Sequence, residues 1–379
     1  MTADALDTRM MQHALTLARR GLGTVWPNPA VGAVIWRMAD GAPVIVGRGF
    51  TQPGGRPHAE TEALRMAGDA ARGAEMAVTL EPCSHHGKTP PCCNAVRQAG
   101  IVRVVSAMED PDPRVNGRGH MMLRAAGIAV RVGVMGREAR LVNRGFIRRV
   151  VDRRPLVTVK IAQTADGFAA RVDGPRLMIT GEEARRQVHL MRAGHDAIMV
   201  GVGTVLGDDP DLTCRLEGME HRSPVRVIID TTLKTPLTSR IVAGAGMVPV
   251  VIVTTPEASP EREAALREKG VRVERVGFGP DGQGVDLGAA MEALGRIGFT
   301  RVLCEGGPRL AEALAMAGLV DSVIVLTGPD ELAGDELAGD GLVALGPHLR
   351  GVMDESRNRY AVEHVAAGAD MIEIYGGRS

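Results

Sequence analysis

PHAETEALRMAGDAARGAEMAVTLEPCSHHGKTPPC, residues 57–92, sets the architecture of the first half of the chain. The spacing of its apolar residues predicts a helix that opens at His58 and stops at Gly68, since glycine favours a helix end. A short strand is expected over residues 77–80, and residues 93–99 again have helical spacing. Strands that alternate with helices in this way predict a layered α/β domain.

The segments on either side of this stretch continue the alternation. In the first half we expect a helix over 5–20, strands over 31–36 and 102–107, a helix and a strand within 120–134, and a loop over 47–57. In the second half we expect strands over 156–163, 197–202, 225–230 and 248–255, helices over 181–194 and 259–270, and a strand–helix–strand unit over 302–328. The basic stretch 144–155 has the composition of a solvated helix end and linker, so the predicted domains are 1–149 and 150–379.

Composition limits the class of protein. The 379 residues exceed what one hydrophobic core usually supports, and 45% of them are hydrophobic. Lys plus Arg and Asp plus Glu are balanced at 45 each, which argues against a protein that binds nucleic acid. The sequence contains neither a secretory signal pattern nor an apolar run long enough to span a membrane, and its five Cys do not resemble a disulfide framework. We therefore expect a cytoplasmic protein without membrane or nucleic-acid partners.

One His and two Cys residues have the types and spacing of a zinc site. His58, Cys83 and Cys92 would supply three ligands, and a zinc hydrolase needs three ligands with the fourth position open to water. Glu60 could reach that water as a proton carrier without being a ligand. The predicted helix starts near His58 and Cys92 would favour a thiolate over a thiol. The pattern predicts a zinc-dependent hydrolase with Glu60 as the catalytic residue.

Two other kinds of zinc protein stay open at this point. A structural or regulatory zinc domain would need a fourth ligand, which Cys93, His85 or His86 could provide. The His-x-Glu and Pro-Cys…Cys pattern is typical of zinc deaminases, so a stand-alone nucleobase deaminase is the second alternative. However, eight residues separate Cys83 from Cys92, where nucleobase deaminases commonly have two, and no basic, aromatic-rich platform for nucleic acid is present.

Two glycine-containing segments of the second half could bind a dinucleotide. VGFGPDGQG at 276–284 fits the G-x-G-x-x-G spacing, but Pro280 and Asp281 interrupt it and no helix is predicted to start on it. We interpret that segment as a loop. Glu305-Gly306-Gly307 instead lies between a predicted strand and a helix that starts with Pro308. Backbone N–H groups there could bind a pyrophosphate, although an ordinary strand–helix turn has the same spacing.

Motifs along nearly the whole chain resemble one bifunctional family. PNPAVGAVI, GRPHAET, EPCSHHGKTPPC and EDPDPRVNGRG, followed by KIAQTADG, HLMRAGHDAIMVGVGTVLGDDPDLTCR, RVIID and VLCEGGPRL, are similar to the bifunctional deaminase–reductase of riboflavin biosynthesis. The resemblance implies a cytidine-deaminase-like α/β/α domain followed by a dihydrofolate-reductase-like α/β domain. It implies zinc-dependent deamination of a diaminopyrimidinone that carries a phosphoribosylamino group, then NADPH-dependent reduction of the opened ribose to ribityl. It also implies a homo-oligomer.

The same resemblance implies roles for individual residues. In the first half, zinc would be held by His58, Cys83 and Cys92, Glu60 would be the proton donor, and the substrate would meet Asn28, His85 and Lys88. In the second half, NADPH would meet Ala162, Met178, Thr204, Asp208, Thr231, Gly307, Pro308, Arg309, Leu310, Ala311, Glu312 and Ala313. The substrate would meet Arg176, Arg192, Leu212, Arg215 and Glu305, and arginine suits a substrate phosphate because its fork binds bidentately. Lys160, Asp166 and Glu305 are the candidate acid–base residues of the reduction.

The chain departs from the family pattern at two places. Thr51 stands where the family usually has His, and Arg176-Leu177-Met178-Ile179-Thr180 stands where it commonly has Ser-x-Trp-Ile-Thr. A third alternative is therefore an active deaminase joined to a reductase that has decayed around Met178.

Overall fold

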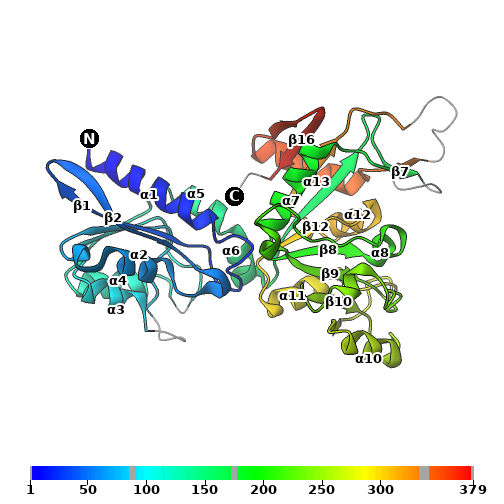
Figure 1. The fold of residues 1–379 in the computed structure, drawn as a ribbon, viewed down its shortest axis with the longest axis horizontal. Helices are drawn as coiled ribbons and strands as arrows, with labels where there is room; N and C mark the ends of the chain where they lie inside the picture. The colour runs from blue at the N-terminus through cyan, green and yellow to red at the C-terminus, as the bar shows by residue number, and fades with distance from the viewer. Residues whose placement is uncertain (1, 85–89, 114, 172–176, 333–340, 377–379) are drawn as a thin grey trace. The chain divides into compact units, whose positions relative to one another are not determined.

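The computed structural model describes residues 2–84, 90–113, 115–171, 177–332 and 341–376. The chain forms two compact units, residues 1–152 and 153–378, drawn in Figure 1 in blue to cyan and in green to red. Within the described residues, no helix has both the length and the apolar character needed to cross a bilayer.

The first unit is built on a five-stranded sheet in the order β2-β1-β3-β4-β5. β1 pairs antiparallel with β2 and β3, and the remaining pairs are parallel. The strands are β1 (Gly32–Ala39), β2 (Ala42–Phe50), β3 (Glu75–Val78), β4 (Arg103–Ser106) and β5 (Ala129–Val132). The helices are α1 (Ala3–Arg19), η1 (Pro53–Gly55), α2 (Ala59–Ala67), η2 (Gly68–Ala71), α3 (Cys92–Gln98), α4 (Arg118–Ala125), α5 (Gly136–Val142) and α6 (Arg144–Asp152).

Helices cover both faces of this sheet. α1 packs on β1 and β3 and also contacts α5, whereas α2 packs on β2 and β1 and contacts α3, which in turn contacts α4. The side of α1 that faces the sheet buries Met10, Met11, Ala14, Leu15 and Ala18. The packing is so close that a Cβ on Gly32 of β1 would lie 1.9 Å from the Ala14 carbonyl oxygen. The unit is therefore a layered α/β domain, as the alternation predicts, in the α/β/α form that the family resemblance implies.

The predicted loop over 47–57 is wrong at its first residues, because β2 continues to Phe50. Gly47 and Gly49 lower the strand propensity of this stretch, but they lie where α2 approaches the strand most closely. A Cβ on Gly47 would lie 2.2 Å from the Ala63 carbonyl oxygen, and one on Gly49 would lie 2.4 Å from that of Ala59. The glycines thus allow α2 to pack directly on the strand.

The second unit contains a nine-stranded sheet in the order β11-β10-β9-β8-β12-β6-β13-β16-β15, and a separate β14–β7 pair. Its strands are β6 (Leu156–Gln163), β7 (Phe168–Arg171), β8 (Ala197–Gly201), β9 (Val225–Ile229), β10 (Val250–Thr254), β11 (Arg272–Arg275), β12 (Arg301–Cys304), β13 (Ser322–Thr327), β14 (Gly341–Val343), β15 (Glu363–Ala367) and β16 (Asp370–Tyr375). Its helices are α7 (Glu182–Ala193), α8 (Val202–Asp208), η3 (Glu220–Arg222), α9 (Arg240–Ala243), α10 (Pro260–Glu268), α11 (Leu287–Ile297), α12 (Pro308–Met316) and α13 (Pro347–Arg359).

Four neighbouring strands of this sheet are parallel and end at the same edge. β9, β8, β12 and β6 lie side by side although β12 and β6 are not neighbours of β8 in the chain, and β10, β11 and β13 extend the parallel run on either side. The segments that follow their carboxyl ends therefore meet, and in open α/β sheets ligands bind at such a change of strand order. This edge is where a site of the second unit is expected.

The G-x-G-x-x-G match at 276–284 is a loop, as predicted. It connects β11 to α11 and contains only the isolated bridge between Phe278 and Val285. α11 begins later, at Leu287, with the side chain of Asp286 accepting a hydrogen bond from the Ala289 N–H. The segment therefore lacks the strand–turn–helix context of a dinucleotide site.

Candidate functional site

The three predicted zinc ligands lie together in the first unit. One ligand atom each from His58, Cys83 and Cys92 forms a group in which all atoms lie within 4.8 Å of one another. The Nδ1 atom of His58 is 3.2 Å from the Cys92 Sγ and 3.7 Å from the Cys83 Sγ. An imidazole and two sulfurs at these separations can converge on one tetrahedral metal ion.

Helix starts hold two of the three ligands in place. His58 is the N-terminal cap residue of α2, and Cys92 is the first residue of α3, as the sequence predicted. The N–H group of Cys92 donates to the Cys83 Sγ at 3.2 Å. Hydrogen bonds from the Cys92 and His58 side chains and from this N–H, opposed by burial, lower the pKa of the Cys83 thiol to about 4. A thiolate at this position is the form that binds zinc.

Glu60 lies beside this cluster in the first turn of α2. Its side chain is buried, and burial raises its pKa to about 6, with the charge of Cys83 raising it and that of His58 lowering it. A carboxyl group whose pKa is close to neutrality can both accept and donate a proton. Its position next to the ligand atoms matches the role of a proton carrier.

The described residues fit an open zinc site. Cys93, considered above as a fourth ligand, turns away, because its Sγ donates to the carbonyl oxygens of Pro82 at 3.2 Å and Gly119 at 3.5 Å. The only group of metal-ligating side chains found among the described residues contains three members. His85, His86 and Lys88 lie outside the described residues. Within the described residues, the donor set is the three-ligand set that a catalytic zinc site uses.

Asn28 and Thr51 lie in the turns that precede His58. Asn28 packs on Gly55, where a Cβ would lie 1.8 Å from the Asn28 Nδ2 atom. Thr51 is buried; its hydroxyl accepts a hydrogen bond from the Val31 N–H at 3.0 Å and approaches the Val31 carbonyl oxygen at 3.5 Å. At the position where the family usually has His, this chain therefore has a side chain that connects two backbone segments.

Sequence reasoning missed Glu81, which directly precedes Pro82-Cys83. Its buried carboxylate accepts hydrogen bonds from four main-chain N–H groups, those of Asp110 and Gly117 before α4 and of Gly119 and His120 in the first turn of α4. These partners lie 29 to 39 residues along the chain, so no local spacing indicates them. Glu81 thus fixes the loop that supplies Cys83.

In the second unit, Glu305 lies at the carboxyl end of β12 in an ion-pair network. Arg192 of α7 binds its two carboxylate oxygens at 2.8 and 3.0 Å, and the Lys160 Nζ of β6 lies 3.7 Å away. Burial disfavours the charge of Glu305, but Arg192 and Lys160 outweigh it and lower its pKa to about 2. Glu305 is therefore a permanent anion at this edge of the sheet. Asp166 lies elsewhere, accepting the Leu332 N–H.

The predicted substrate residues around Arg215 follow α8 in an extended segment. Leu212 is buried and has a left-handed backbone with a φ of 56°. The Thr213 carbonyl oxygen accepts a hydrogen bond from Arg192 at 3.0 Å, so that the guanidinium of Arg192 is shared between Glu305 and this segment. Arg215 keeps 55% of its side chain exposed. Of the two described arginines predicted to bind substrate, Arg215 is the one that can meet a phosphate in solvent. The third, Arg176, lies outside the described residues.

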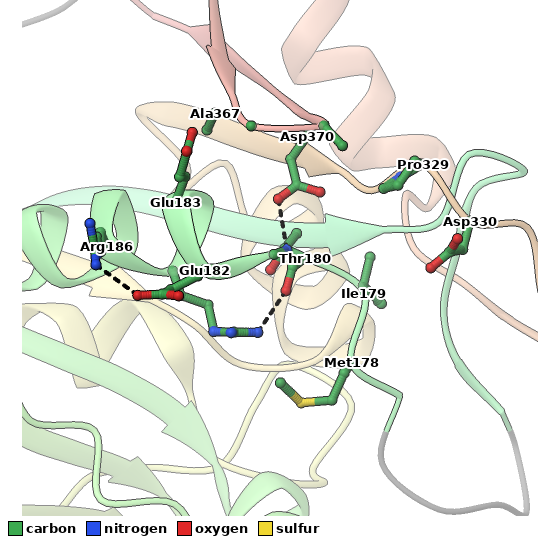
Figure 2. Close-up of a pocket in the computed structure, with 14 residues that line it drawn as sticks. Met178, Ile179, Thr180, Glu182, Glu183, Arg186, Pro329, Asp330, Ala367 and Asp370 are labelled. Carbon is green, nitrogen blue, oxygen red and sulfur yellow. Dashed lines mark hydrogen bonds and ion pairs between the residues drawn. The ribbon is translucent and has the colours of Figure 1, made fainter.

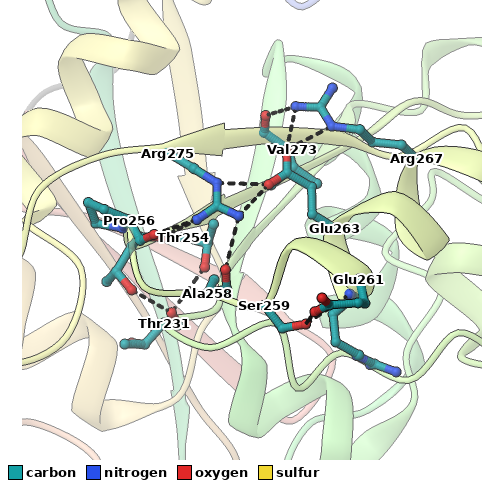
Figure 3. Close-up of polar contacts among 12 residues, drawn as sticks. Thr231, Thr254, Pro256, Ala258, Ser259, Glu261, Glu263, Arg267, Val273 and Arg275 are labelled. Carbon is teal, nitrogen blue, oxygen red and sulfur yellow. Dashed lines mark hydrogen bonds and ion pairs between the residues drawn. The ribbon is translucent and has the colours of Figure 1, made fainter.

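The predicted cofactor residues of β6, β8 and β9 share the carboxyl edge. Ala162 lies near the end of β6, Thr204 and Asp208 lie in α8 directly after β8, and Thr231 follows β9. Figure 3 shows how the Thr231 carbonyl accepts the Thr254 and Thr255 hydroxyls at 3.0 and 2.9 Å. The following loop is held by Arg275, whose guanidinium donates to the carbonyls of Pro256 and Ala258 and pairs with Glu263. The structure brings these predicted residues to one edge.

The segment 307–313 forms the start of α12. Gly307 is the N-terminal cap residue without a side-chain cap bond, Pro308 is in the first turn, and a Cβ on Gly307 would meet no atom within 4 Å. Pro308 has no N–H and the Leu310 N–H donates to the Gly307 carbonyl oxygen at 3.1 Å, so the N–H groups of Gly307 and Arg309 are the ones that a pyrophosphate could meet. Farther along, Ala311 is fully buried, and the Glu312 carboxylate instead accepts the N–H groups of His348 and Leu349 at the start of α13. Gly307 to Leu310 therefore form the part of this segment that can face a cofactor.

Met178 lies in the wall of a cavity of about 510 Å³ at the start of α7, which Pro329 and Asp330 after the carboxyl end of β13 also line. Figure 2 shows that the polar groups of this wall bind one another: Asp370 accepts the Gly181 N–H at 2.7 Å, and Arg186 pairs with Glu182 at 2.7 Å. Met178 is 59% exposed, and no other predicted cofactor residue lines the cavity. The cavity therefore adjoins the carboxyl end of β13, which is parallel to β6, at the same edge of the sheet as Glu305.

Comparisons with known families agree with both sites. Residues 4–108 match the cytidine and deoxycytidylate deaminase zinc-binding region, and residues 155–345 match the RibD C-terminal domain. The riboflavin biosynthesis protein RibD of Escherichia coli is 42% identical over 341 residues, covering 87% of this chain and 89% of that protein. RibD of Aquifex aeolicus is 40% identical over 324 residues, covering 86% and 87%.

Solved structures resemble the whole chain. RibD of Acinetobacter baumannii has a TM-score of 0.83 at 32% identity, with 99% of each chain covered. A diaminohydroxyphosphoribosylaminopyrimidine deaminase/5-amino-6-(5-phosphoribosylamino)uracil reductase from Thermotoga maritima has a TM-score of 0.78 at 32% identity, covering 98% of this chain and 99% of that one. The predicted fold, a cytidine-deaminase-like domain followed by a dihydrofolate-reductase-like one, is confirmed, and so are zinc and NADPH as the cofactors. The chain belongs to the RibD family of bifunctional zinc-dependent deaminases and NADPH-dependent reductases of riboflavin biosynthesis.

Proposed function

We propose that residues 1–149 deaminate 2,5-diamino-6-(phosphoribosylamino)pyrimidinone and that residues 150–379 then reduce its ribosyl side chain to ribityl. The observation that carries this assignment is the convergence of His58, Cys83 and Cys92 beside buried Glu60. The same substrate and reaction are printed in the name of the Thermotoga maritima protein that this chain resembles.

For the deamination, His58, Cys83 and Cys92 hold zinc. When bound, zinc supplies the Lewis acidity that activates water for attack at neutral pH. Glu60 takes a proton from the attacking water and delivers it to the amino group, which leaves as ammonia while the ring carbonyl forms. Burial of Glu60 supports this double role, since it raises its pKa to about 6. Asn28, together with His85 and Lys88, would contact the substrate.

For the reduction, the edge formed by β9, β8, β12 and β6 binds both reactants. When bound, NADPH would supply the hydride that reduces the carbonyl carbon of the opened sugar. Gly307 to Leu310 would hold the pyrophosphate of NADPH. The rest of the cofactor would contact Ala162, Thr204, Asp208 and Thr231. Arg215 holds the substrate phosphate, and Lys160, whose Nζ lies 3.7 Å from the Glu305 carboxylate, is the candidate that donates a proton to the sugar oxygen. Arg192 keeps Glu305 oriented through its bidentate pair.

The alternative of a decayed reductase has no support in this network. The departures from the family pattern lie at 176–180, whereas the Glu305–Arg192–Lys160 group and the α12 start are intact. A structural-zinc protein is also disfavoured, because residues 4–108 match a deaminase zinc-binding region and the buried Glu60 lies beside the three ligands. For partners and location we propose a cytoplasmic homo-oligomer that binds neither nucleic acid nor membranes, in keeping with the balanced charge of the chain.

The test is a coupled assay with purified protein, zinc and the phosphoribosylamino-diaminopyrimidinone, in which ammonia release and NADPH oxidation are followed separately. Both signals are expected, with NADPH oxidation dependent on prior deamination. Ammonia release without NADPH oxidation would support the decayed reductase, and neither signal despite bound zinc would support the structural-zinc protein.

Glu60→Gln separates the proton carrier from the metal site. Removing a general acid–base group typically costs about 10² to 10⁴ in rate, so ammonia release should fall by that factor. Zinc content and NADPH oxidation with the deaminated intermediate should stay at wild-type values. Near wild-type ammonia release in this variant would show that Glu60 does not carry the proton.

A further inference from the structure

Helix α7 presents two side chains to the segment that carries Arg215. His189 and Arg192 are three residues apart, so they lie on the same face of the helix. Arg192 donates to the Thr213 carbonyl oxygen at 3.0 Å, while the His189 Nδ1 accepts the main-chain N–H of Arg215 at 3.2 Å. The Cys214 thiol adds a third contact, to the His189 carbonyl oxygen at 3.5 Å. The backbone on both sides of Cys214 is thus held against α7.

The contact at His189 requires a neutral imidazole, because a protonated ring has no acceptor atom. Burial lowers the pKa of His189, the positive charges of Arg192 and Arg215 lower it further, and Glu305 and the Thr213 carbonyl oppose them. The surroundings therefore favour the ring form that can accept the Arg215 N–H. The family resemblance implies no role for His189, and the proposed reduction assigns it none.

We propose that His189 is a positioning residue for Arg215: by accepting the Arg215 main-chain N–H, it fixes where the Arg215 guanidinium emerges and so sets the affinity of the reductase for its phosphorylated substrate. The inference rests on the proposed role of Arg215 in binding the substrate phosphate. The side chain of Arg215 is more than half exposed, and its nearest described carboxylate, that of Asp211, is 4.0 Å away. The direction in which the Arg215 side chain points therefore depends on how its main chain is held.

The test compares His189→Ala, His189→Asn and His189→Gln in the full-length enzyme, with KM and kcat measured for NADPH-dependent reduction of the deaminated intermediate. An asparagine places its amide oxygen near the position of Nδ1, whereas glutamine extends to the position of Nε2. Loss of one hydrogen bond to a main-chain group corresponds to about a ten-fold change, so KM should rise by about that factor in the alanine and glutamine variants. The asparagine variant should stay near the wild-type KM, and kcat should change by less than about two-fold in all three.

Two controls make the result specific. Circular dichroism and thermal unfolding of the second unit should match wild type, which shows that each variant is folded, and ammonia release by the first unit should be unchanged, which confines the effect to the reductase. With the intermediate lacking its phosphate, the differences in KM between wild type and variants should disappear. If His189→Ala does not fold, the difference in KM between His189→Asn and His189→Gln tests the same point.

Arg215→Ala distinguishes the failure of this inference from that of the proposed function. A raised KM in Arg215→Ala with wild-type KM in all three His189 variants would overturn the positioning role and leave the proposed function intact. Equal losses in the asparagine, alanine and glutamine variants would overturn the acceptor argument. An unchanged KM in Arg215→Ala would overturn the proposed role of Arg215, and the positioning role with it.

Discussion

Cys92 and Cys93 are neighbours in the chain, yet their sulfur atoms lie in different surroundings. The Cys92 Sγ faces the His58 Nδ1 at 3.2 Å, whereas the Cys93 Sγ donates to the carbonyl oxygens of Pro82 and Gly119. This follows from α3 starting at Cys92, since consecutive helical residues point about 100° apart. Only one of the two thiols can therefore reach the metal site.

Cys92→Ala should abolish zinc binding and deamination, because two ligands do not make a stable zinc site. The measurement is zinc content per chain after dialysis, together with ammonia release and NADPH oxidation. The matched control is Cys93→Ala, which should keep its zinc while losing some stability through its two hydrogen bonds. Zinc at full occupancy in Cys92→Ala would show that the cluster is not the metal site.

His195 makes stability depend on pH. Its ring contacts the Met191 carbonyl oxygen at 2.7 Å, and burial, followed by the charge of Arg301, lowers its pKa to about 4. Between pH 6.5 and 4 the unfolded chain binds a proton at this residue and the folded chain does not, so stability is lost as pH falls through this range. The loss attributable to His195 reaches about 3 kcal/mol at the acid end, at 1.36 kcal/mol per pKa unit.

The measurement for His195 is the free energy of unfolding at several pH values between 7 and 4. In His195→Gln, the free energy of unfolding should change less steeply with pH than in wild type. This holds even if the substitution also changes the free energy of unfolding at pH 7. The same change at exposed His221 serves as the control and should leave the slope as in wild type. Equal slopes for wild type and His195→Gln would contradict the prediction.

At the scale of elements, the contact between β2 and α2 positions the first site. α2 begins directly after His58 and carries Glu60, and it rests on the backbone of β2 at Gly47 and Gly49. A side chain at either glycine would displace the helix. The geometry of the metal ligand and of the proton carrier therefore depends on two residues without side chains.

Gly49→Ala should destabilise the first unit by about 2 kcal/mol, since overpacking a rigid contact typically costs 1–3 kcal/mol. The added Cβ would lie 2.4 Å from the Ala59 carbonyl oxygen and 2.6 Å from the Ala63 nitrogen. Urea unfolding gives the stability, and competition with a chelator gives the zinc affinity, which should also fall. Val44→Ala, an exposed change on the same strand, should cost less than about 0.5 kcal/mol. Equal stabilities would show that α2 adjusts without strain.

The sequence could predict the elements with strong periodicity and the residues with a recognisable motif. The helix expected over 58–68 is α2, and the helix expected over 259–270 is α10, which Ser259 caps. β2 was not predicted, because its glycines lower strand propensity and its close packing against α2 is a tertiary contact. α8 was not predicted, since Gly203 and Gly207 make it a poor helix by propensity.

The same limit applies to the sites. His58, Glu60, Cys83 and Cys92 could be found because ligand chemistry demands these residue types at short spacing. The supporting residues could not, since His189 acts on a backbone N–H 26 residues along the chain and Glu81 on four such groups even farther away. Their partners are main-chain atoms, which carry no sequence signal.

At the scale of the whole molecule, each site is assembled within one unit. The zinc ligands, Glu60 and Glu81 belong to residues 1–152, and the strand ends, α7 and α12 belong to residues 153–378. The chain changes unit between Asp152 and Arg153. Arg154 already belongs to the second unit, because it donates to Asp321 at 2.7 and 3.1 Å and Asp321 also accepts the Val157 N–H.

We therefore predict that the two halves function when produced as separate chains, 1–152 and 153–379. The first should bind one zinc and release ammonia, and the second should oxidise NADPH only when given the deaminated intermediate. A second cut provides the control: ending the first fragment at Gln163 removes β6 from between β12 and β13, so the remaining fragment 164–379 should fail to fold. Circular dichroism and thermal unfolding report folding, and the two assays report activity. If fragment 153–379 folds but is inactive until 1–152 is added, the reductase site needs the first unit, and the independence of the two sites would be refuted.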